Sequence, residues 1–230
     1  MAEQTQALSE STQMYLINIL RLAKDGEPVP LSQLAAALDV SPISANQMCR
    51  KLQDEGLVTY LPYKGVSITP PGQQIAARIL RRHRLWEVFL VEQLHMHWEE
   101  AHDAACRMEH TTPDEVIERL DLFLEHPRVN PQGEPIPTSA GGFSRVCPRP
   151  LTEFDAGHRV HCIRCLADEA ACGFLAAQGL RPGACFELVV AAPDALLLDV
   201  NGQRLTINRS LAAALLVEPS QESRTEGASQ

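Results

Sequence analysis

The nine residues from His102 to His110 are rich in side chains that bind metals. Cys106, Glu109 and His110 are spaced so that on a helix they share one face, and His102 lies one turn before Cys106. A thiolate, a carboxylate and imidazoles together suit ferrous iron, cobalt, nickel or zinc better than calcium or magnesium. The segment therefore predicts a transition-metal site.

A second pair of such residues lies earlier in the chain. His83 and Glu87 are four residues apart, so they also share a helix face. An isolated His–Glu pair is often only a solvated helix surface. The prediction that this pair binds metal therefore depends on the denser 102–110 segment packing beside it.

The chain has seven cysteines, and an odd number argues against a disulfide framework. Cys162, Cys165 and Cys172 are spaced by three and seven residues, and they could bind zinc or an iron–sulfur cluster. The alternative is that they are small apolar residues packed inside a barrel. The spacing leaves both interpretations open.

The N-terminal third predicts a winged helix-turn-helix. Helical patterns at 11–23, 31–38 and 42–55 precede two short strand patterns at 57–61 and 66–69. Although the net charge is -9, residues 41–84 hold seven Lys or Arg and only two Asp or Glu, as phosphate binding requires. The candidate DNA contacts on the third helix and the strand turn are Ser41, Ser44, Asn46, Gln47, Arg50, Lys51 and Lys64.

The rest of the chain predicts a helical middle and a small β barrel, so the fold class is mainly α with a small β part. Helices are expected at 70–94, 98–110 and 113–127. Barrel strands are expected at 158–163, 185–191, 195–200 and 204–207, with a helix at 167–178. The expected domains are a winged helix at 1–76, a helical metal-binding and dimerisation domain at 77–137, a linker at 138–155, the barrel at 156–218 and a disordered tail at 219–230.

These motifs, in this order, resemble the diphtheria-toxin-repressor family of metal-dependent regulators, in its iron-responsive branch. The resemblance covers residues 11–137. It rests on residues 12–16 (TQMYL), 56–58 (GLV), 82–85 (RHRL), 102–110 and 130–137. Residues 156–218 resemble the FeoA-like, SH3-type barrel that many members carry at their C-terminus.

The resemblance implies two metal sites in each subunit. Its regulatory site would use Met14, Cys106, Glu109 and His110. Its ancillary site would use His83, Glu87 and His102 with oxygen donors from the barrel. The family's barrel supplies a Glu and a Gln, whereas the nearest candidates here are Asp168 and Glu169.

The resemblance also implies the metal and the partners. In the manganese-responsive branch carboxylates occupy the positions of Met14 and Cys106, so their absence here favours Fe²⁺, with Mn²⁺, Zn²⁺, Co²⁺ or Ni²⁺ as alternatives. Bound metal would fix the angle between the recognition helices. A single winged helix reads few base pairs, so we expect a homodimer on double-stranded operator DNA.

The expected function is thus a metal-dependent transcriptional repressor and not an enzyme. With 45% apolar residues the chain can bury a core, and it has neither a secretory signal pattern nor a membrane-spanning stretch, so we expect a cytoplasmic protein. The alternatives are a sensor of another metal or of a cluster, a metalloenzyme, or an interaction adaptor that uses the barrel.

Overall fold

The computed structural model describes residues 8–24, 26–143 and 147–220, so most of the tail expected at 219–230 lies outside the described residues. The chain divides into two compact units. The first unit contains the residues up to 86, with 99–120 and 137–143. The second contains 87–98, 121–136 and the residues from 144 onward.

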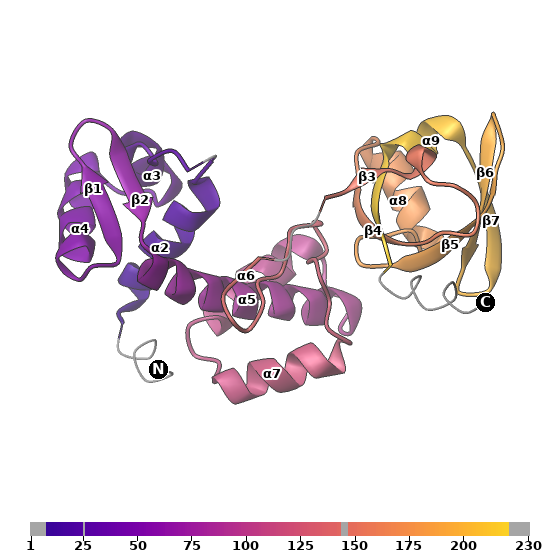
Figure 1. Ribbon diagram of the computed structural model, residues 1–230. Helices are drawn as coiled ribbons and strands as arrows, with labels where there is room; N and C mark the ends of the chain where they lie inside the picture. Colours follow the sequence, from indigo (N-terminus) through magenta and orange to yellow (C-terminus); the bar gives the residue numbers. More distant parts are fainter. Residues whose placement is uncertain (1–7, 25, 144–146, 221–230) are drawn as a thin grey trace, which may run out of the picture. The chain divides into compact units, whose positions relative to one another are not determined.

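The first unit begins with the expected winged helix-turn-helix (Figure 1). Its helices and strands are α2 (Glu10–Leu22), α3 (Leu31–Ala37), α4 (Pro42–Asp54), β1 (Val58–Leu61) and β2 (Gly65–Ile68). Ser9 and Ser41 cap α2 and α4, because each hydroxyl accepts a hydrogen bond from a backbone N–H of the first turn. Leu16, Leu34 and Leu52 are fully buried in the shared core.

The strand turn of this domain is tied to the segment that precedes α3. Val29 and Val66 exchange two backbone hydrogen bonds of 2.8 and 2.9 Å. Gly65 makes this approach feasible: its φ is 131°, and an added Cβ would lie 2.2 Å from the Val29 carbonyl oxygen. The wing is therefore held, close to its turn, to the segment that precedes α3.

Three helices follow: α5 (Pro70–Glu92), α6 (Trp98–Met108) and α7 (Asp114–Phe123). Both later helices end before the expected residues, so Glu109 and His110 lie in the turn after α6, not on the helix itself. Among the described residues, no helix is both long and apolar enough to cross a membrane.

The basic surface is smaller than the residue count of segment 41–84 suggested. Arg81, Arg82 and Arg84 are all buried on α5. Arg82 pairs with Asp114 at 2.6 Å and donates to the Glu109 carbonyl at 3.3 Å, and Arg81 donates to the Pro137 carbonyl at 3.0 Å. These arginines hold the surrounding helices and turns together, which the one-dimensional charge count could not reveal.

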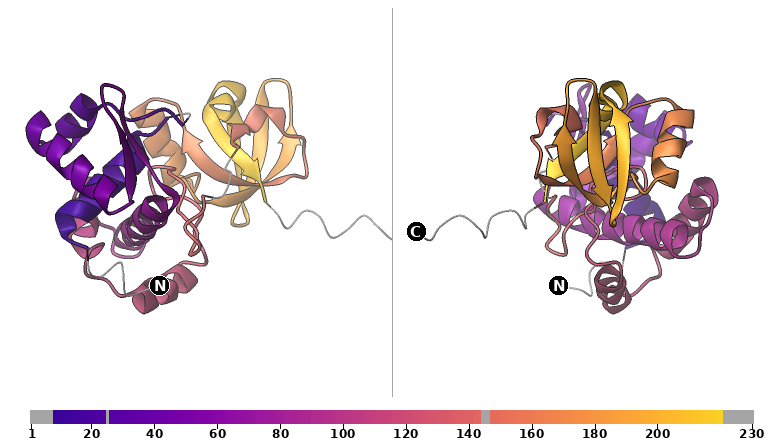
Figure 2. Two further views of the ribbon diagram at one scale, coloured as in Figure 1. Left: turned by 60° about the vertical axis from the view of Figure 1, so that its left-hand side comes forward. Right: turned by 90° about the vertical axis from the view of Figure 1, so that its right-hand side faces the viewer.

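The second unit contains the expected barrel, an antiparallel sheet with strand order β3-β8-β4-β5-β6-β7 (Figure 2). Its elements are β3 (Arg149–Pro150), η1 (Leu151–Glu153), β4 (Arg159–Cys165), α8 (Glu169–Ala177), β5 (Cys185–Ala191), β6 (Ala195–Val200), β7 (Gln203–Asn208), α9 (Arg209–Ala214) and β8 (Leu215–Pro219). Leu151 and Phe154 are buried in its core, so this fold begins inside the segment expected to be a linker.

Candidate metal centre

A buried carboxylate between two imidazoles lies at the centre of the first unit. Glu109 is 2% exposed and His83 is 1% exposed. The Oε2 atom of Glu109 is 2.8 Å from His83 Nδ1, and its Oε1 atom is 3.2 Å from His110 Nε2. One carboxylate thus brings together a histidine of α5 and a histidine of the turn after α6.

The thiol of Cys106 joins this arrangement through His102 on α6. His102 Nδ1 is 3.2 Å from His83 Nε2, and His102 Nε2 is 3.8 Å from Cys106 Sγ. Within the described part of the chain, His83, His102 and Cys106 form the group of three metal-binding side chains whose ligand atoms all lie within 4.8 Å of one another.

Two of these separations, both 3.2 Å, suit pairs of ligand atoms that share a cation. Nitrogen and oxygen ligands at about 2.1 Å from a metal lie about 3.0 to 3.4 Å apart when the angle between them is square or tetrahedral. The pair of His110 Nε2 and Glu109 Oε1 falls in that range at 3.2 Å. The donor set of nitrogen, oxygen and sulfur therefore fits a transition-metal ion.

Local hydrogen bonds hold the turn that carries Glu109 and His110. The Glu109 N–H still donates to Ala105 O at 2.9 Å, as if α6 continued, while Arg82 donates to the Glu109 carbonyl. Thr112 donates to Met108 O and accepts from the Trp86 indole N–H at 3.0 Å. The helix end is thus fixed by buried partners, which positions the carboxylate between the imidazoles.

Met14, the ligand that the resemblance implies on α2, packs against an apolar cluster of Ile17, Ile79 and Leu80. Its neighbour Gln13 contacts the metal centre instead, because Gln13 Oε1 is 2.8 Å from His110 Nδ1. The role of Met14 as a ligand stays a prediction.

Glu87 belongs to the second unit and is held by other residues of that unit. It is 1% exposed, and its Oε2 atom accepts a hydrogen bond of 2.7 Å from the side-chain amide of Asn130. The same amide donates to Glu134 Oε2 at 3.3 Å. The carboxylates of Glu87 and Glu134 therefore converge on the buried amide of Asn130. Asn130 and Glu134 lie in the segment 130–137, which carries part of the resemblance.

The barrel residues expected to add oxygen donors are both exposed. Asp168 caps α8, because its carboxylate accepts from the Ala171 N–H at 2.8 Å. Glu169 is the first residue of that helix. Their contribution to an ancillary site, and the assignment of His83, Glu87 and His102 to that site, stay predictions.

Comparison with known proteins identifies the domains that carry this arrangement. Residues 7–66 match the family model of the iron-dependent repressor DNA-binding domain, and residues 69–138 match the model of its metal-binding and dimerisation domain. An uncharacterised HTH-type transcriptional regulator of Methanocaldococcus jannaschii is 36% identical over 119 residues, which are 51% of this chain and 95% of that protein. The chain belongs to the iron-dependent repressor family.

Other relatives of this iron-dependent repressor family member are named for iron. The iron-dependent repressor IdeR of Mycobacterium tuberculosis is 34% identical over 130 residues, which are 56% of each chain, so the match spans just over half of that protein. Residues 149–219 match the FeoA domain model. The expected family, the fold class and the identity of the C-terminal domain are confirmed.

Solved structures that resemble this family member are named for several metals. A manganese-dependent transcriptional repressor in complex with manganese has a TM-score of 0.58 and 28% identity, and the match covers 91% of this chain and all of that one. ScaR with bound Zn²⁺ has a TM-score of 0.56 and 27% identity, with 90% and 98% covered. The likeness therefore supports a metal-dependent repressor without selecting the metal.

The barrel cysteines of this family member do not form a comparable group. Burial raises the pKa of the Cys162 thiol to about 12. Burial and then a hydrogen bond with Cys165 raise the pKa of Cys172 to about 11. In the described part of the chain no three of these sulfurs meet the spacing found at His83, His102 and Cys106. The cluster stays a prediction.

The polar residues expected to contact DNA, most of them on the recognition helix α4, differ in whether their side chains have partners in the protein. Ser41 and Ser44 are hydrogen-bonded to each other at the helix start, and Asn46 Oδ1 accepts from Arg50 Nε at 3.0 Å. Gln47, Lys51 and Lys64 are exposed. Of these three, Lys51 lies 3.9 Å from Glu55. Among the described residues, Gln47 and Lys64 are therefore the expected DNA contacts whose exposed side chains have no such partner.

Two residues near the functional surfaces were not expected from the sequence. Gln13 precedes Met14 in the matched motif, but nothing in its type predicted a contact with His110. Tyr63 is fully exposed at the tip of the wing with a φ of 65°. The sequence Pro-Tyr-Lys-Gly, which is typical of a turn, was the signal that could have predicted the exposure of Tyr63.

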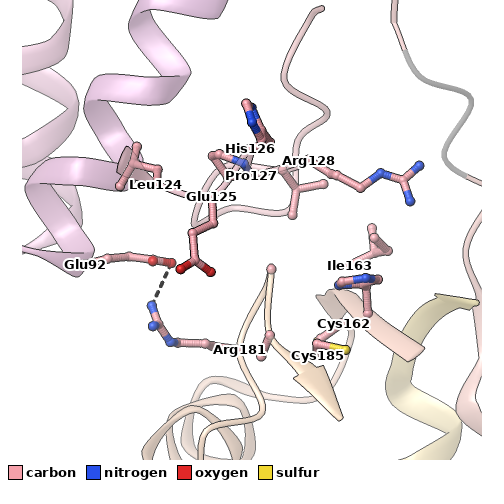
Figure 3. Close-up of a pocket in the computed structure, with 14 residues that line it drawn as sticks. Glu92, Leu124, Glu125, His126, Pro127, Arg128, Cys162, Ile163, Arg181 and Cys185 are labelled. Carbon is pink, nitrogen blue, oxygen red and sulfur yellow. Dashed lines mark ion pairs between the residues drawn. The ribbon is translucent and has the colours of Figure 1, made fainter. Parts of the chain in front are cut away.

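A cavity of about 490 Å³ lies in the second unit (Figure 3). Arg181 on its wall forms an ion pair of 2.7 Å with Glu92, and Arg128 pairs with Glu218. Burial raises the pKa of Glu92 and of Glu218, and the paired arginine opposes each shift. Because a carboxylate already matches each arginine, these charges select no class of ligand.

Proposed function

We propose that this chain is a ferrous-iron-dependent repressor in which metal bound near Glu109 controls binding to operator DNA. The observation that carries the proposal is the buried contact of Glu109 with His83 and His110. Cys106 and Met14 would complete the regulatory site. The family membership supports the role, since its models describe a DNA-binding domain joined to a metal-binding one.

The residues of the centre explain how metal could change DNA affinity. Bound metal supplies a positive charge to a buried carboxylate and fixes the ligands that surround it. Gln13, in the first turn of α2, already contacts His110. A ligand shifts an equilibrium only by its different affinity for the two states, so metal must bind more tightly when α2 is in its DNA-competent position.

The sulfur donor supports iron over manganese. A thiolate is a soft ligand, whereas manganese prefers carboxylate and carbonyl oxygens. Several sequence relatives are named for iron, although the structural neighbours include manganese-dependent proteins. Zinc and cobalt also accept this donor set, so the metal must be identified by experiment.

The proposed assembly is a homodimer on double-stranded DNA in the cytoplasm. Leu122 and Phe123, at the end of α7, are 65% and 61% exposed, which suits an apolar contact with a second copy. A two-fold dimer would present two recognition helices to symmetric half-sites. The family model of this region is named for dimerisation.

The experiment that tests the function measures operator affinity as a function of metal. The protein would first select its binding sequence from random duplexes under anaerobic conditions with Fe²⁺. Its affinity for that duplex would then be titrated with Fe²⁺, Mn²⁺, Zn²⁺ and Co²⁺ in turn. We expect Fe²⁺ to give the largest increase at physiological concentrations. Equal affinity with and without every metal would contradict the proposal.

We expect Gln47 to read bases and Lys64 to hold phosphate. Gln47→Ala should relax sequence preference by roughly 1–3 kcal/mol, because an amide can pair with an adenine edge. Lys64→Ala should weaken binding to all sequences alike and reduce the salt slope by about one. Binding to operator variants at several salt concentrations separates the two effects. Gln73→Ala, an exposed glutamine on α5, is the control, and exchanged phenotypes would refute the assignment.

A further inference from the structure

Gln13 is a buried amide, 5% exposed, whose two polar atoms both have protein partners. Its Nε2 atom donates to the backbone carbonyl of Leu8 at 3.0 Å. Its Oε1 atom lies 2.8 Å from His110 Nδ1. Gln13 therefore joins the residues that precede α2 to the metal centre.

The orientation of the amide follows from its partners. A backbone carbonyl only accepts hydrogen bonds, so the NH₂ group of Gln13 must face Leu8. The carbonyl oxygen of Gln13 must then face His110, and an oxygen acceptor requires a hydrogen on Nδ1. The two contacts together place a proton on Nδ1 of His110, so of the two neutral tautomers they favour the one that carries its proton there.

That tautomer leaves the lone pair of His110 on Nε2. The Nε2 atom is the one that faces Glu109 Oε1 at 3.2 Å, in the range expected for two ligands of one cation. The same ring therefore has one nitrogen fixed by a protein acceptor and the other directed at the proposed metal position. A histidine ligand is usually oriented by such a hydrogen bond from its second nitrogen.

We propose that Gln13 is a positioning residue of the regulatory metal site. It holds His110 in the Nδ1–H tautomer, so that Nε2 is ready to bind the ion, and it links that ring to Leu8, which precedes α2. The inference rests on the proposed function only in that His110 is a metal ligand. It goes further by assigning a role to a residue that does not itself touch the metal.

A merely structural glutamine would behave differently on substitution. Gln13→Met keeps a side chain of similar length but removes both hydrogen bonds. Gln13→Glu keeps an acceptor for Nδ1–H but cannot donate to Leu8. Gln13→Met should lose the preference of His110 for the Nδ1–H tautomer. Gln13→Glu should keep that preference but weaken the contact with Leu8.

The tautomer can be measured without added metal. In the full chain labelled with ¹⁵N-histidine, long-range ¹H–¹⁵N spectra distinguish Nδ1–H from Nε2–H. We expect His110 to be Nδ1–H in the native protein and in Gln13→Glu, and to lose that preference in Gln13→Met. Arg21→Met, an exposed change on the same helix, should leave the His110 signals unchanged.

Metal affinity is then measured by titration with Co²⁺, followed by the absorption of a cobalt–thiolate bond to Cys106. Gln13→Met should bind Co²⁺ about 10- to 100-fold more weakly, the usual cost of losing such a hydrogen-bond partner, and Gln13→Glu should lose less than about 10-fold. Native tautomer and native affinity in Gln13→Met would overturn the inference, as would a changed tautomer with unchanged affinity. If the native protein bound no Co²⁺, the proposed function itself would fail, which is a distinct result.

Discussion

Replacing Cys106 with alanine should abolish metal-activated operator binding and leave the protein folded. Cys106 is proposed as the sulfur donor of the regulatory site, and it is only partly buried on α6, so its loss leaves no large cavity. Loss of a residue that merely orients a ligand costs about 10- to 100-fold in metal affinity, so loss of a direct ligand should cost more than about 100-fold. Operator affinity with and without Fe²⁺ gives the measurement.

The matched control is Cys147→Ala, which makes the same chemical change at an exposed cysteine. It should keep native metal dependence. Circular dichroism and light scattering would confirm that both variants keep the native helix content and mass. A Cys106→Ala protein with native metal dependence would remove this residue from the site and with it the main argument for iron.

The second large effect is expected from Gly72→Ala, at the junction of the wing and α5. An added Cβ would lie 2.1 Å from the carbonyl oxygen of Leu57 and 3.1 Å from Ile68 Cγ1. Because the nearest atom belongs to the backbone, α5 or the wing must shift. Overpacking of this kind costs about 1–3 kcal/mol or more, which should exceed the helix-propensity gain of about 1 kcal/mol.

Gly173→Ala is the matched control, since an added Cβ on α8 would meet nothing within 4 Å. That variant should gain about 0.5–1 kcal/mol in the free energy of unfolding. Urea unfolding followed by NMR signals of β1 and of β5 would report each domain separately. If the wing of Gly72→Ala were as stable as that of the native protein or more stable, the junction of the wing and α5 would have relaxed to accommodate the added methyl group.

Close contacts through α2 and α5 join the candidate metal centre to the DNA-binding domain. The Gln13 contact with His110 and the Gly72 contact with Leu57 both join the first domain to the helices that follow it. We expect bound metal to act on the recognition helix through such contacts.

The sequence by itself determined the winged helix and the spacing of the ligands. Helical periodicity, serine caps before α2 and α4 and the turn at the wing are local signals, so their boundaries agree with the structure within about two residues. His102 and Cys106 share a helix face for the same reason. The short strands β3 and β8 were not predicted, because their sequences have no regular pattern.

Only the tertiary structure decided which distant residues meet. Gln13 and His110 are 97 positions apart, and no local pattern predicts their contact. Arg81 and Arg82 looked like surface charge, but they are buried by α7 and by the carbonyls of Glu109 and Pro137. Burial and long-range pairing depend on how the elements pack, and packing is a property of the whole chain, not of any segment.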